Sequence, residues 1–450
     1  MRKLSESRCL TKVIQLTVRD KNPLAKRLLI LTSKLGYQTR GFADAAKKLG
    51  VDVVFGTDRC HKLDDPWGDS AHPLHFEAPQ DAAMEIAEQL RGEPPDAIIA
   101  LGDRTTPAAA YAARAFGIVG NPPEAVEACR NKLRQRRVLS AAKVLVPEFF
   151  SFAPSDKMEH VLARVQYPCV VKPLTLAASQ GVIRANNAGE FEFAVKRIRF
   201  LLDSPEIQAQ RELGMDELLV EKYIPGREVA VEGLLELGKL RVLAIFDKPD
   251  PLEGPYFEET IYVTPSRLPV EMQAGLVAGL ERSVRALGLV AGPIHAEFRV
   301  NEMGPWVLEV APRPIGGLCS RALRFGPERI SLEELLIRQA LNMGGSDAKR
   351  EEDASGVMMI PVPRSGIFEG TQGMEAAEAI PGIDQIVIAA RPRDYIAAWP
   401  EGSSYLGFIF ARRESPSEVE DALRAAHAEL KFRFSPRLPV EHPISGRVQS

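Results

Sequence analysis

The chain has 450 residues, of which 45% are hydrophobic and 26% are charged, and its formal net charge is −3. This composition is typical of an ordinary globular protein, and the length corresponds to about three domains. The small net charge excludes a strongly basic or acidic binding surface as a property of the whole chain, so we expect neither nucleic acid nor a membrane as a partner.

The cysteines are scattered and odd in number, and none belongs to a CxxC pair, which argues against a disulfide framework or a zinc site. They are Cys9, Cys60, Cys129, Cys169 and Cys319. The first residues lack the apolar core of a signal peptide, and no run reaches the roughly 18 apolar residues of a membrane span. We therefore expect a cytoplasmic protein.

Residues 25–122 alternate between strand and helix patterns, which predicts a parallel sheet with helices on its faces. The predicted strands are Arg27–Thr32, Val51–Phe55, Asp96–Leu101 and a fourth that begins at Gly117–Val119. The predicted helices are Phe42–Leu49, Asp81–Leu90 and Pro107–Phe116. The turn at 33–36 follows the first strand, where such folds bind ligands, but it is not the GxGxxG of a dinucleotide site.

A basic helix is predicted within residues 124–153. Its cations are Arg130, Lys132, Arg134, Arg136, Arg137 and Lys143. They fall all round the helix with no aromatic residues between them, so solvated charges are a better interpretation than a nucleic-acid surface. One of these cations could still reach a nearby phosphate.

A small α/β unit is predicted over residues 154–225. The apolar strand Cys169–Pro173 carries Lys172 near its end, and a loop at 174–182 with Ser179 and Gly181 follows. Small residues and glycine allow backbone N–H groups to surround an anion, although the loop is not a Walker A motif. Strands are also predicted at Leu218–Ile224 and Val229–Gly233.

Two glutamates are placed to face each other. Glu297 and Glu309 lie in the predicted strands Gly292–Val300 and Trp306–Val310, which a short segment with Gly304 joins. If these strands form a hairpin, period-2 alternation puts both carboxylates on one face, together with His295 and Arg299. Such a pair repels unless a cation lies between the two groups, and Mg²⁺ prefers oxygen ligands of this kind. A solvated hairpin with two exposed glutamates would show the same pattern.

The segment that begins at Glu309 has the residues of an anion site. Arg313 offers a planar guanidinium to a carboxylate or phosphate, and Gly316 and Gly317 permit close backbone approach to a ligand. The segment therefore favours a metal-bound phosphate beside a second anion.

The C-terminal block, residues 350–450, predicts strands at Val357–Pro363, Ile383–Ala390 and Ser404–Ala411. Ser415 and Glu418 form a capping box for a helix that starts at Pro416. Val419, Leu423, Ala426 and Leu430 line one face of that helix, which predicts packing on a sheet. We see no catalytic signature in this block.

The order of these motifs resembles the ATP-grasp superfamily over about residues 25–345. The carrying motifs are Asn-Lys-x₂-Arg, Val-Val-Lys-Pro with its Ser-x-Gly loop, Glu-Lys-Tyr-Ile-x-Gly-x-Glu, His-x-Glu and Glu-x₃-Arg-x₂-Gly-Gly. The resemblance implies an α/β (α+β) ATP-grasp fold. It implies a Rossmann-like N-terminal domain at 1–123, a lid region at 124–225, a large region with the metal and substrate site at 226–349, and a C-terminal α+β domain at 350–450.

The resemblance also implies roles for single residues. Those assigned to ATP are Lys132, Lys172, Ser179, Gly181, Glu221, Lys222, Ile224 and Glu228. The lysines would contact phosphates, Ser179 and Gly181 would lie in the covering loop, the hinge at 221–224 would hold adenine, and Glu228 would bind ribose. Glu297 and Glu309 match the Mg²⁺ ligands, with Mn²⁺ as an alternative ion. Arg313, Lys172, Gly316 and Gly317 match the reacting centre.

One departure concerns the metal site. Many members have Asn two residues after the second glutamate, whereas this chain has Ala311, which cannot coordinate a metal. Water or substrate would have to fill that position, so a second fully ligated Mg²⁺ is in doubt.

This departure, the Arg-x₂-Gly-Gly segment and the C-terminal block together resemble the L-amino-acid ligase branch. The stretches Asp247–Pro249 and Gly254–Ser266 resemble its substrate-facing part, in which Glu259 would hold an amino group and Tyr262 stands where some members carry His. A solvated acid at Glu259 and a hydrogen-bonded strand residue at His295 remain equally simple interpretations.

The expected function is therefore a carboxylate–amine ligase that uses ATP, forms an acyl phosphate and then an amide, and releases ADP and phosphate. The substrates would be small molecules, in the first place amino acids, and a homodimer is the common assembly in such enzymes. A carboxylase or purine-pathway ligase of the same superfamily and a non-catalytic ATP-binding module are the alternatives.

Overall fold

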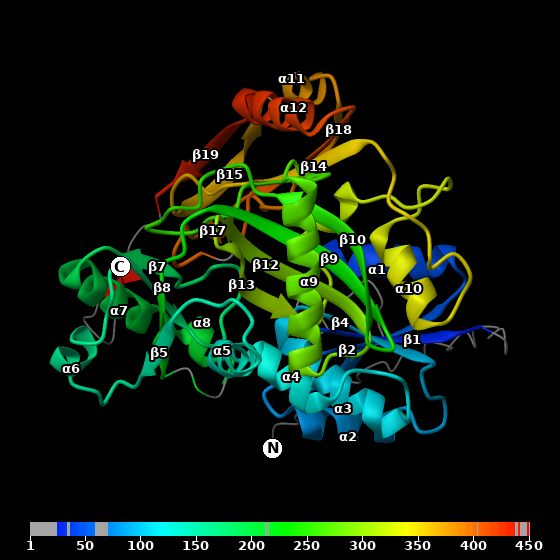
Figure 1. The fold of residues 1–450 in the computed structure, drawn as a ribbon. Coiled ribbons are helices and arrows are strands. Elements are labelled where there is room, and N and C mark those ends of the chain that lie inside the picture. The colour runs from blue at the N-terminus through cyan, green and yellow to red at the C-terminus, as the bar shows by residue number, and fades with distance from the viewer. Residues whose placement is uncertain are drawn as a thin grey trace, which may run out of the picture.

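The computed structural model describes residues 25–33, 37–58, 71–211, 214, 216–402, 404–436, 440–441 and 448–449. The turn predicted at 33–36 falls mostly outside these residues, as do Cys9 and Cys60. The chain forms an N-terminal parallel sheet, a small antiparallel sheet, a large antiparallel sheet and a C-terminal layer above it (Figure 1). Within the described residues, no helix is both long and apolar enough to cross a bilayer.

The N-terminal sheet has the strand order β3-β2-β1-β4, and all of its pairs are parallel, as predicted. Its strands are β1 (Arg27–Thr32), β2 (Asp52–Thr57), β3 (Ala71–Pro73) and β4 (Ala97–Leu101). Its helices are α1 (Tyr37–Lys48), α2 (Pro79–Gln89), the 3-10 helix η2 (Asp103–Thr105) and α3 (Thr106–Phe116). The middle of strand β1, residues 28–31, is apolar because one face packs on α1 and the other on α2 and α3.

The predicted strand at Gly117–Val119 is wrong. Gly117 instead ends α3 in a left-handed conformation with φ of 68°, which glycine adopts without strain, and Val119 is 73% exposed. The fourth strand of the sheet is β3, which the sequence analysis missed because three residues are too short for a period-2 pattern.

The predicted basic helix is two helices, α4 (Pro123–Arg130) and α5 (Lys132–Ala141). Asn131 separates them in an extended conformation, and its side chain accepts a hydrogen bond from the backbone N–H of Arg134 at 3.0 Å. Three of the predicted solvated cations, Arg134, Arg137 and Lys143, are exposed, but Arg136 is fully buried.

The small sheet, which we call the lid after the lid region expected here, has the strand order β5-β8-β6-β7. Its elements are β5 (Phe149–Phe152), α6 (Met158–Leu162), β6 (Cys169–Pro173), β7 (Ile183–Ala185), α7 (Ala188–Leu202), α8 (Pro205–Gln208) and β8 (Leu218–Lys222). Apolar side chains of α7 pack on one face of this sheet, so the lid has a core of its own. The strands predicted at 169–173 and 218–224 are confirmed.

The large sheet has the order β13-β12-β9-β10-β11-β14-β18-β16. The elements up to residue 340 are β9 (Arg227–Glu236), β10 (Lys239–Asp247), β11 (Ile261–Thr264), α9 (Val270–Leu287), β12 (Gly292–Asn301), β13 (Gly304–Ala311), the 3-10 helix η3 (Cys319–Ala322) and α10 (Leu332–Ala340). Helix α9 lies across one face of this sheet (Figure 1). The N-terminal sheet and α10 share a core with the sheet's other face.

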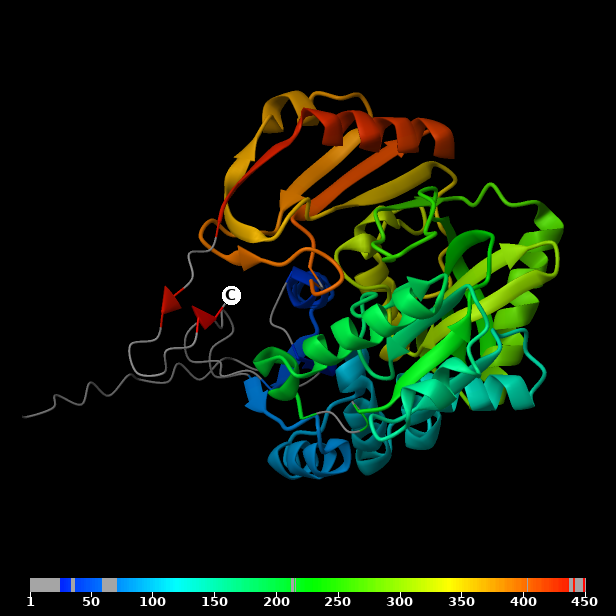
Figure 2. The same cartoon turned by 90° about the vertical axis from the view of Figure 1, so that its left-hand side faces the viewer.

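The C-terminal residues extend the same sheet and then cover it. Their elements are β14 (Ala354–Ile360), β15 (Gly366–Gln372), α11 (Met374–Glu378), β16 (Ile383–Ile388), β17 (Tyr395–Ile396), β18 (Gly407–Arg413), α12 (Pro416–Glu429), β19 (Lys431–Ser435), β20 (Val440–Glu441) and β21 (Val448–Gln449). Helix α12 lies above β14 and β18 (Figure 2). Its capping box at Ser415 and its apolar face are formed as predicted. The three predicted strands of this block are confirmed as β14, β16 and β18.

Candidate active site

The hairpin expected around Glu297 and Glu309 is present. Strands β12 and β13 are antiparallel, and Glu297 is paired in register with Glu309, with a bulge directly after this pair. Both carboxylates are partly exposed, at 22% and 28% of their side-chain area. The Nε2 atom of His295 lies 3.3 Å from Glu297, and Lys132 Nζ lies 3.8 Å from Glu309.

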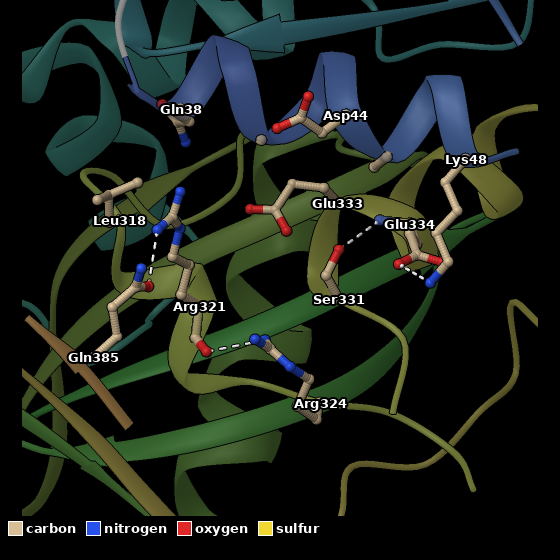
Figure 3. Close-up of a pocket in the computed structure, with 12 residues that line it drawn as sticks. Gln38, Asp44, Lys48, Leu318, Arg321, Arg324, Ser331, Glu333, Glu334 and Gln385 are labelled. Carbon is tan, nitrogen blue, oxygen red and sulfur yellow. Dashed lines mark hydrogen bonds and ion pairs between the residues drawn. The ribbon is translucent and has the colours of Figure 1, made fainter. Parts of the chain in front are cut away.

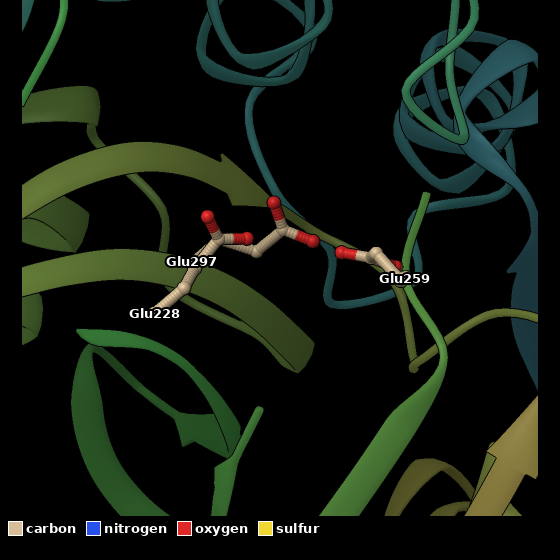
Figure 4. Close-up of side chains that lie close together, drawn as sticks. All are labelled: Glu228, Glu259 and Glu297. Atoms are coloured by element: carbon tan, nitrogen blue, oxygen red, sulfur yellow. The ribbon is translucent and has the colours of Figure 1, made fainter. Parts of the chain in front are cut away.

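Lys248 is the cation at the centre of the site, and the sequence analysis placed it in the substrate-facing stretch Asp247–Pro249 without giving it a role. Its buried Nζ donates to Glu228 at 2.9 Å and to Glu259, and it lies 3.5 Å from Glu297. The nearest oxygens of these three carboxylates lie within 4.8 Å of one another (Figure 4). Burial lowers the pKa of Lys248, but the three carboxylates raise it well above its usual value, so the ammonium stays charged.

The predicted substrate residues Glu259 and Tyr262 lie in this cluster. The Tyr262 hydroxyl donates to Glu259 at 2.9 Å, and Lys248 Nζ lies 5.0 Å from the centre of the Tyr262 ring. Burial, followed by the charges of Glu297 and Glu228, raises the pKa of Glu259 against the opposing effect of Lys248. Glu259 is therefore a partly buried acid with a side chain 16% exposed and held by two hydrogen bonds, which is not the solvated residue of the simpler interpretation.

His295 is likewise held on both sides. Its Nδ1 pairs with the buried carboxylate of Glu232, and its Nε2 approaches Glu297. Burial lowers the pKa of His295, but Glu232 and Glu297 raise it to about 9, so the imidazolium is charged at neutral pH. The same imidazolium, with Lys248, holds the pKa of Glu297 far below its usual range although burial opposes this.

The donor set around Glu297 and Glu309 fits a divalent cation. Both side chains offer hard carboxylate oxygens from adjacent strands, as Mg²⁺ requires. Among the described residues, the partner of Glu309 is Lys132 at 3.8 Å, longer than a hydrogen bond, so its oxygens retain free lone pairs. The triplet of Glu228, Glu259 and Glu297 is a poorer choice because Lys248 Nζ already lies within 3.5 Å of an oxygen of each carboxylate. Ala311 is buried opposite His295 and provides no donor.

Arg313 is fixed by a residue from the N-terminal domain. Its Nε donates to Asp103 Oδ1 at 2.7 Å, and its Nη1 donates to the carbonyl of Pro314 at 3.1 Å. Burial lowers the pKa of Arg313 while Asp103 raises it above its usual value, and Arg313 in turn lowers the pKa of Asp103. The sequence analysis did not select Asp103, although Gly102-Asp103 at the end of a parallel strand was a usable signal.

The two glycines after Arg313 differ. Gly317 has φ of +63°, and a Cβ atom there would lie 3.0 Å from the ring of Phe408. Gly316 has no heavy atom within 4 Å of the corresponding position. Only Gly317 is therefore required by the packing.

The predicted phosphate lysines lie at the inner edge of the lid. Lys132 Nζ donates to the carbonyl of Leu176 at 2.7 Å, in the loop that follows β6. Lys172 is buried and pairs with Glu221 at 2.7 Å, and Arg136 pairs with the other oxygen of Glu221 at 2.6 Å. Burial raises the pKa of Glu221, but the two cations lower it below its usual value. Burial is also the main cause that lowers the pKa of Lys172.

The other hinge residues occupy different surroundings. The Lys222 side chain is half exposed and lies 3.5 Å from Glu148, whereas Ile224 is buried and its carbonyl accepts from Arg299 at 3.4 Å. Glu228 is held by Lys248 and by Arg299 at 3.1 Å. Lys222 therefore lies apart from the carboxylate cluster, while Glu228 belongs to it.

The loop with Ser179 and Gly181 contacts the C-terminal residues. The Gly181 N–H donates to the carbonyl of Pro400 at 3.3 Å, and Gln180 Nε2 donates to the carbonyl of Glu401 at 2.7 Å. The Glu401 carboxylate forms a two-point ion pair with Arg197 of α7, at 2.5 and 3.0 Å. Among the described residues, Ser179 and Gly181 have no hydrogen bond to the carboxylate cluster. We call the contact of residues 180, 181 and 197 with 400–401 the lid clasp.

Three family models match successive parts of the chain. An ATP-grasp N-terminal domain matches residues 43–119, an ATP-grasp domain matches 165–322, and L-amino acid ligase C-terminal domain 2 matches 358–435. The first covers strands β2, β3 and β4 of the N-terminal sheet, and the second covers most of the small sheet and of the large sheet. The third accounts for most of the C-terminal layer.

Individual proteins agree with these models. The crystal structure of L-amino acid ligase from Bacillus licheniformis is similar at a TM-score of 0.74 and 27% identity, over 91% of this chain and 99% of that one. An uncharacterized protein of Sinorhizobium fredii, y4rH, is 28% identical over 72% of this chain, and Carnosine synthase 1 of Gallus gallus is 28% identical over 66%. The chain spans 65% and 34% of the lengths of these two relatives. The chain therefore has the ATP-grasp fold and contains ATP-grasp domains, and its C-terminal part matches a domain of L-amino acid ligases.

Proposed function

We propose that the protein is an ATP-dependent carboxylate–amine ligase that forms an amide bond between two small molecules, in the first place amino acids. The observation that carries this proposal is that Lys248 lies 3.5 Å from Glu297 and that the charge of Arg313 acts on both Glu297 and its strand partner Glu309. Buried cations beside paired carboxylates suit phosphoryl transfer to an acid, in which negative charge must be neutralised and held in place.

For ATP, we assign Lys132 and Lys172 to the phosphates and the backbone of 221–224 to the adenine. The Glu221 carboxylate is already paired with Arg136 and Lys172, so its part is to position Lys172. Glu228 remains our choice for the ribose hydroxyls. We assign Mg²⁺ to Glu297 and Glu309, where the ion would neutralise phosphate charge when bound.

The chemistry proceeds in two steps. A substrate carboxylate oxygen bonds to the γ-phosphorus of ATP and ADP leaves, which gives an acyl phosphate. The amine nitrogen of the second substrate then bonds to the acyl carbon, phosphate leaves, and the nitrogen loses a proton. Arg313 binds the carboxylate and the transferred phosphoryl group, while Glu259, oriented by Tyr262 and Lys248, accepts the ammonium group of an amino acid substrate. The loop at 178–182 excludes water, which would hydrolyse the acyl phosphate.

The test is Mg-dependent phosphate release from ATP with mass spectrometry of the products, across all pairs of the twenty L-amino acids. A pair that yields ADP, phosphate and a dipeptide supports the proposal and identifies the substrates. ATP consumption without an amide product would refute it in favour of a carboxylase or a purine-pathway type of ligase.

Two variants complete the test. Glu297→Gln removes a proposed metal ligand with little change in shape and should abolish turnover. Arg282→Met, on the exposed face of α9, is the matched control and should behave as the wild type. A Glu297→Gln variant with unchanged turnover would contradict the metal assignment, and a wild type that binds ATP without any turnover would indicate a binding module.

A further inference from the structure

A second polar cavity lies on the outer side of the Arg313–Gly317 segment. It has a volume of about 290 Å³ and is bounded by α1, by the stretch from Leu318 through η3 to the start of α10, and by Gln385 of β16 (Figure 3). We call it the α1–α10 pocket. Its three walls come from the N-terminal domain, the large sheet region and the C-terminal block, so a ligand there would contact all three.

Two charged side chains of this pocket, Arg321 and Glu333, form no ion pair with each other. Arg321 points into it from η3, and Glu333 points toward Arg321 from the start of α10 (Figure 3). The Arg321 guanidinium donates to Gln385 Oε1 at 3.1 Å, but within the described residues it forms no ion pair with Glu333 or with Asp44, which also lines the pocket. The space between the Arg321 guanidinium and the Glu333 carboxylate is therefore open to a ligand that contacts both groups.

Two buried glutamates at the start of α10, Glu333 and Glu334, form one side of the pocket. Glu333 is 6% exposed, and its Oε1 accepts a hydrogen bond from the Ser320 hydroxyl at 2.6 Å, which holds the carboxylate in place. Its neighbour Glu334 is also 6% exposed, pairs through Oε1 with Lys48 at 2.8 Å, and has a buried Oε2 without a hydrogen-bond partner. A buried carboxylate oxygen that accepts no hydrogen bond destabilises the folded protein unless a donor group reaches it.

We propose that the α1–α10 pocket binds a zwitterion, namely a free α-amino acid or a dipeptide, with its carboxylate on Arg321 and its ammonium group on Glu333. The carboxylate of such a ligand pairs with the Arg321 guanidinium and its ammonium group pairs with the Glu333 carboxylate, so one molecule satisfies both side chains. A volume near the lower limit for small-molecule pockets admits a ligand of this size. The pocket is lined by three acids, Asp44, Glu333 and Glu334, and by three cations, Lys48, Arg321 and Arg324, and this balance of charge suits a zwitterion better than a polyanion.

The pocket is connected to the active site by a short path. Gln38, which lines the pocket, donates through Nε2 to the carbonyl of Ile315 at 3.0 Å, and the Ile315 N–H donates to Glu232 Oε2 at 3.1 Å. Glu232 in turn holds His295. A bound zwitterion would therefore order the segment that carries Arg313 and change the rate of the reaction. This regulatory part rests on the proposed function, whereas binding itself does not.

The test is calorimetric titration of the full chain, saturated with Mg-ADP, with each of the twenty L-amino acids and with L-alanyl-L-alanine. The wild type should bind at least one of these probes at a site that Arg321→Met removes, with a loss of affinity of at least about 10-fold. Arg282→Met, which also removes an arginine but lies on α9, should retain it. The N-acetyl and amide forms of the bound probe, each lacking one charge, should bind about 10-fold more weakly.

The outcomes separate this proposal from the ligase reaction. Probes that bind equally to the wild type, to Arg321→Met and to Glu333→Gln would overturn it, as would the absence of binding by all probes. Arg313→Met, which alters the proposed catalytic site, should retain the Arg321-dependent binding. Binding that is lost in Arg313→Met and kept in Arg321→Met would place the zwitterion in the active site alone. Circular dichroism of each variant checks its folding, and the partly exposed Arg321 is the safer of the two substitutions.

Discussion

The lid clasp provides a direct test of how the C-terminal residues act on the reaction. Glu401 binds Arg197 through both carboxylate oxygens, and its backbone carbonyl accepts from Gln180 in the loop over the proposed phosphate site. Glu401→Gln removes the charge but leaves the backbone contact in place. We predict that this variant closes its lid less completely and therefore loses acyl phosphate to water.

The magnitude follows from exposure and geometry. The Arg197 and Glu401 side chains are 32% and 35% exposed, which places the pair in the range of surface ion pairs, about 0.2–1 kcal/mol. Two-point geometry favours the upper end, about 1 kcal/mol. That free energy changes the ratio of closed to open lid by about five-fold, because about 1.4 kcal/mol corresponds to ten-fold.

The assay measures amide formed per ATP consumed, together with the KM for ATP. In Glu401→Gln we expect the hydrolysis of ATP that is not accompanied by amide formation to increase by up to about five-fold. The KM for ATP should rise by a similar factor. Protease cleavage of the loop at 178–182 gives a readout that does not depend on the identity of the substrates, and it should become faster. Glu375→Gln, an exposed acid of α11, is the control.

A double-mutant cycle with Arg197→Met decides whether the ion pair itself is responsible. If the two residues act together, the double variant should resemble either single variant. Strictly additive effects, or an unchanged cleavage rate in Glu401→Gln, would refute the reasoning.

Three further predictions concern stability and are measured by urea unfolding. Arg136→Met should destabilise the protein by about 3 kcal/mol, because it leaves the buried carboxylate of Glu221 with one partner in place of two, whereas exposed Arg137→Met should be neutral. The pKa of Glu221 is lowered in the folded state, so the ionised carboxylate stabilises the protein at pH values above 4.5, the usual pKa of a glutamate. This stabilisation is lost as the pH falls below 4.5, and Glu221→Gln should therefore lose less stability on acidification than the wild type. Gly317→Ala should cost at least about 1 kcal/mol and Gly316→Ala less than about 0.5 kcal/mol, and equal effects would contradict the packing at Phe408.

Local patterns were sufficient for the features that involve neighbouring residues. The hairpin of Glu297 and Glu309 followed from period-2 alternation and a short turn, since side-chain direction in a strand is set by its pleat. The capping box at Ser415 followed from side-chain and backbone groups three residues apart. Each of these interactions is complete within about fifteen residues, so the sequence specifies it without reference to the remaining fold.

The tertiary structure alone decided which distant groups meet. Lys248 gathers Glu228, Glu259 and Glu297 from separate segments, and Asp103 reaches Arg313 across 210 positions of the chain. The same holds for the lid clasp, the α1–α10 pocket, and the single sheet that continues from β11 into β14. Sequence periodicity predicts which face a residue occupies but not which other face packs against it, because that choice depends on how the sheets and helices of the whole chain bury their apolar surfaces together.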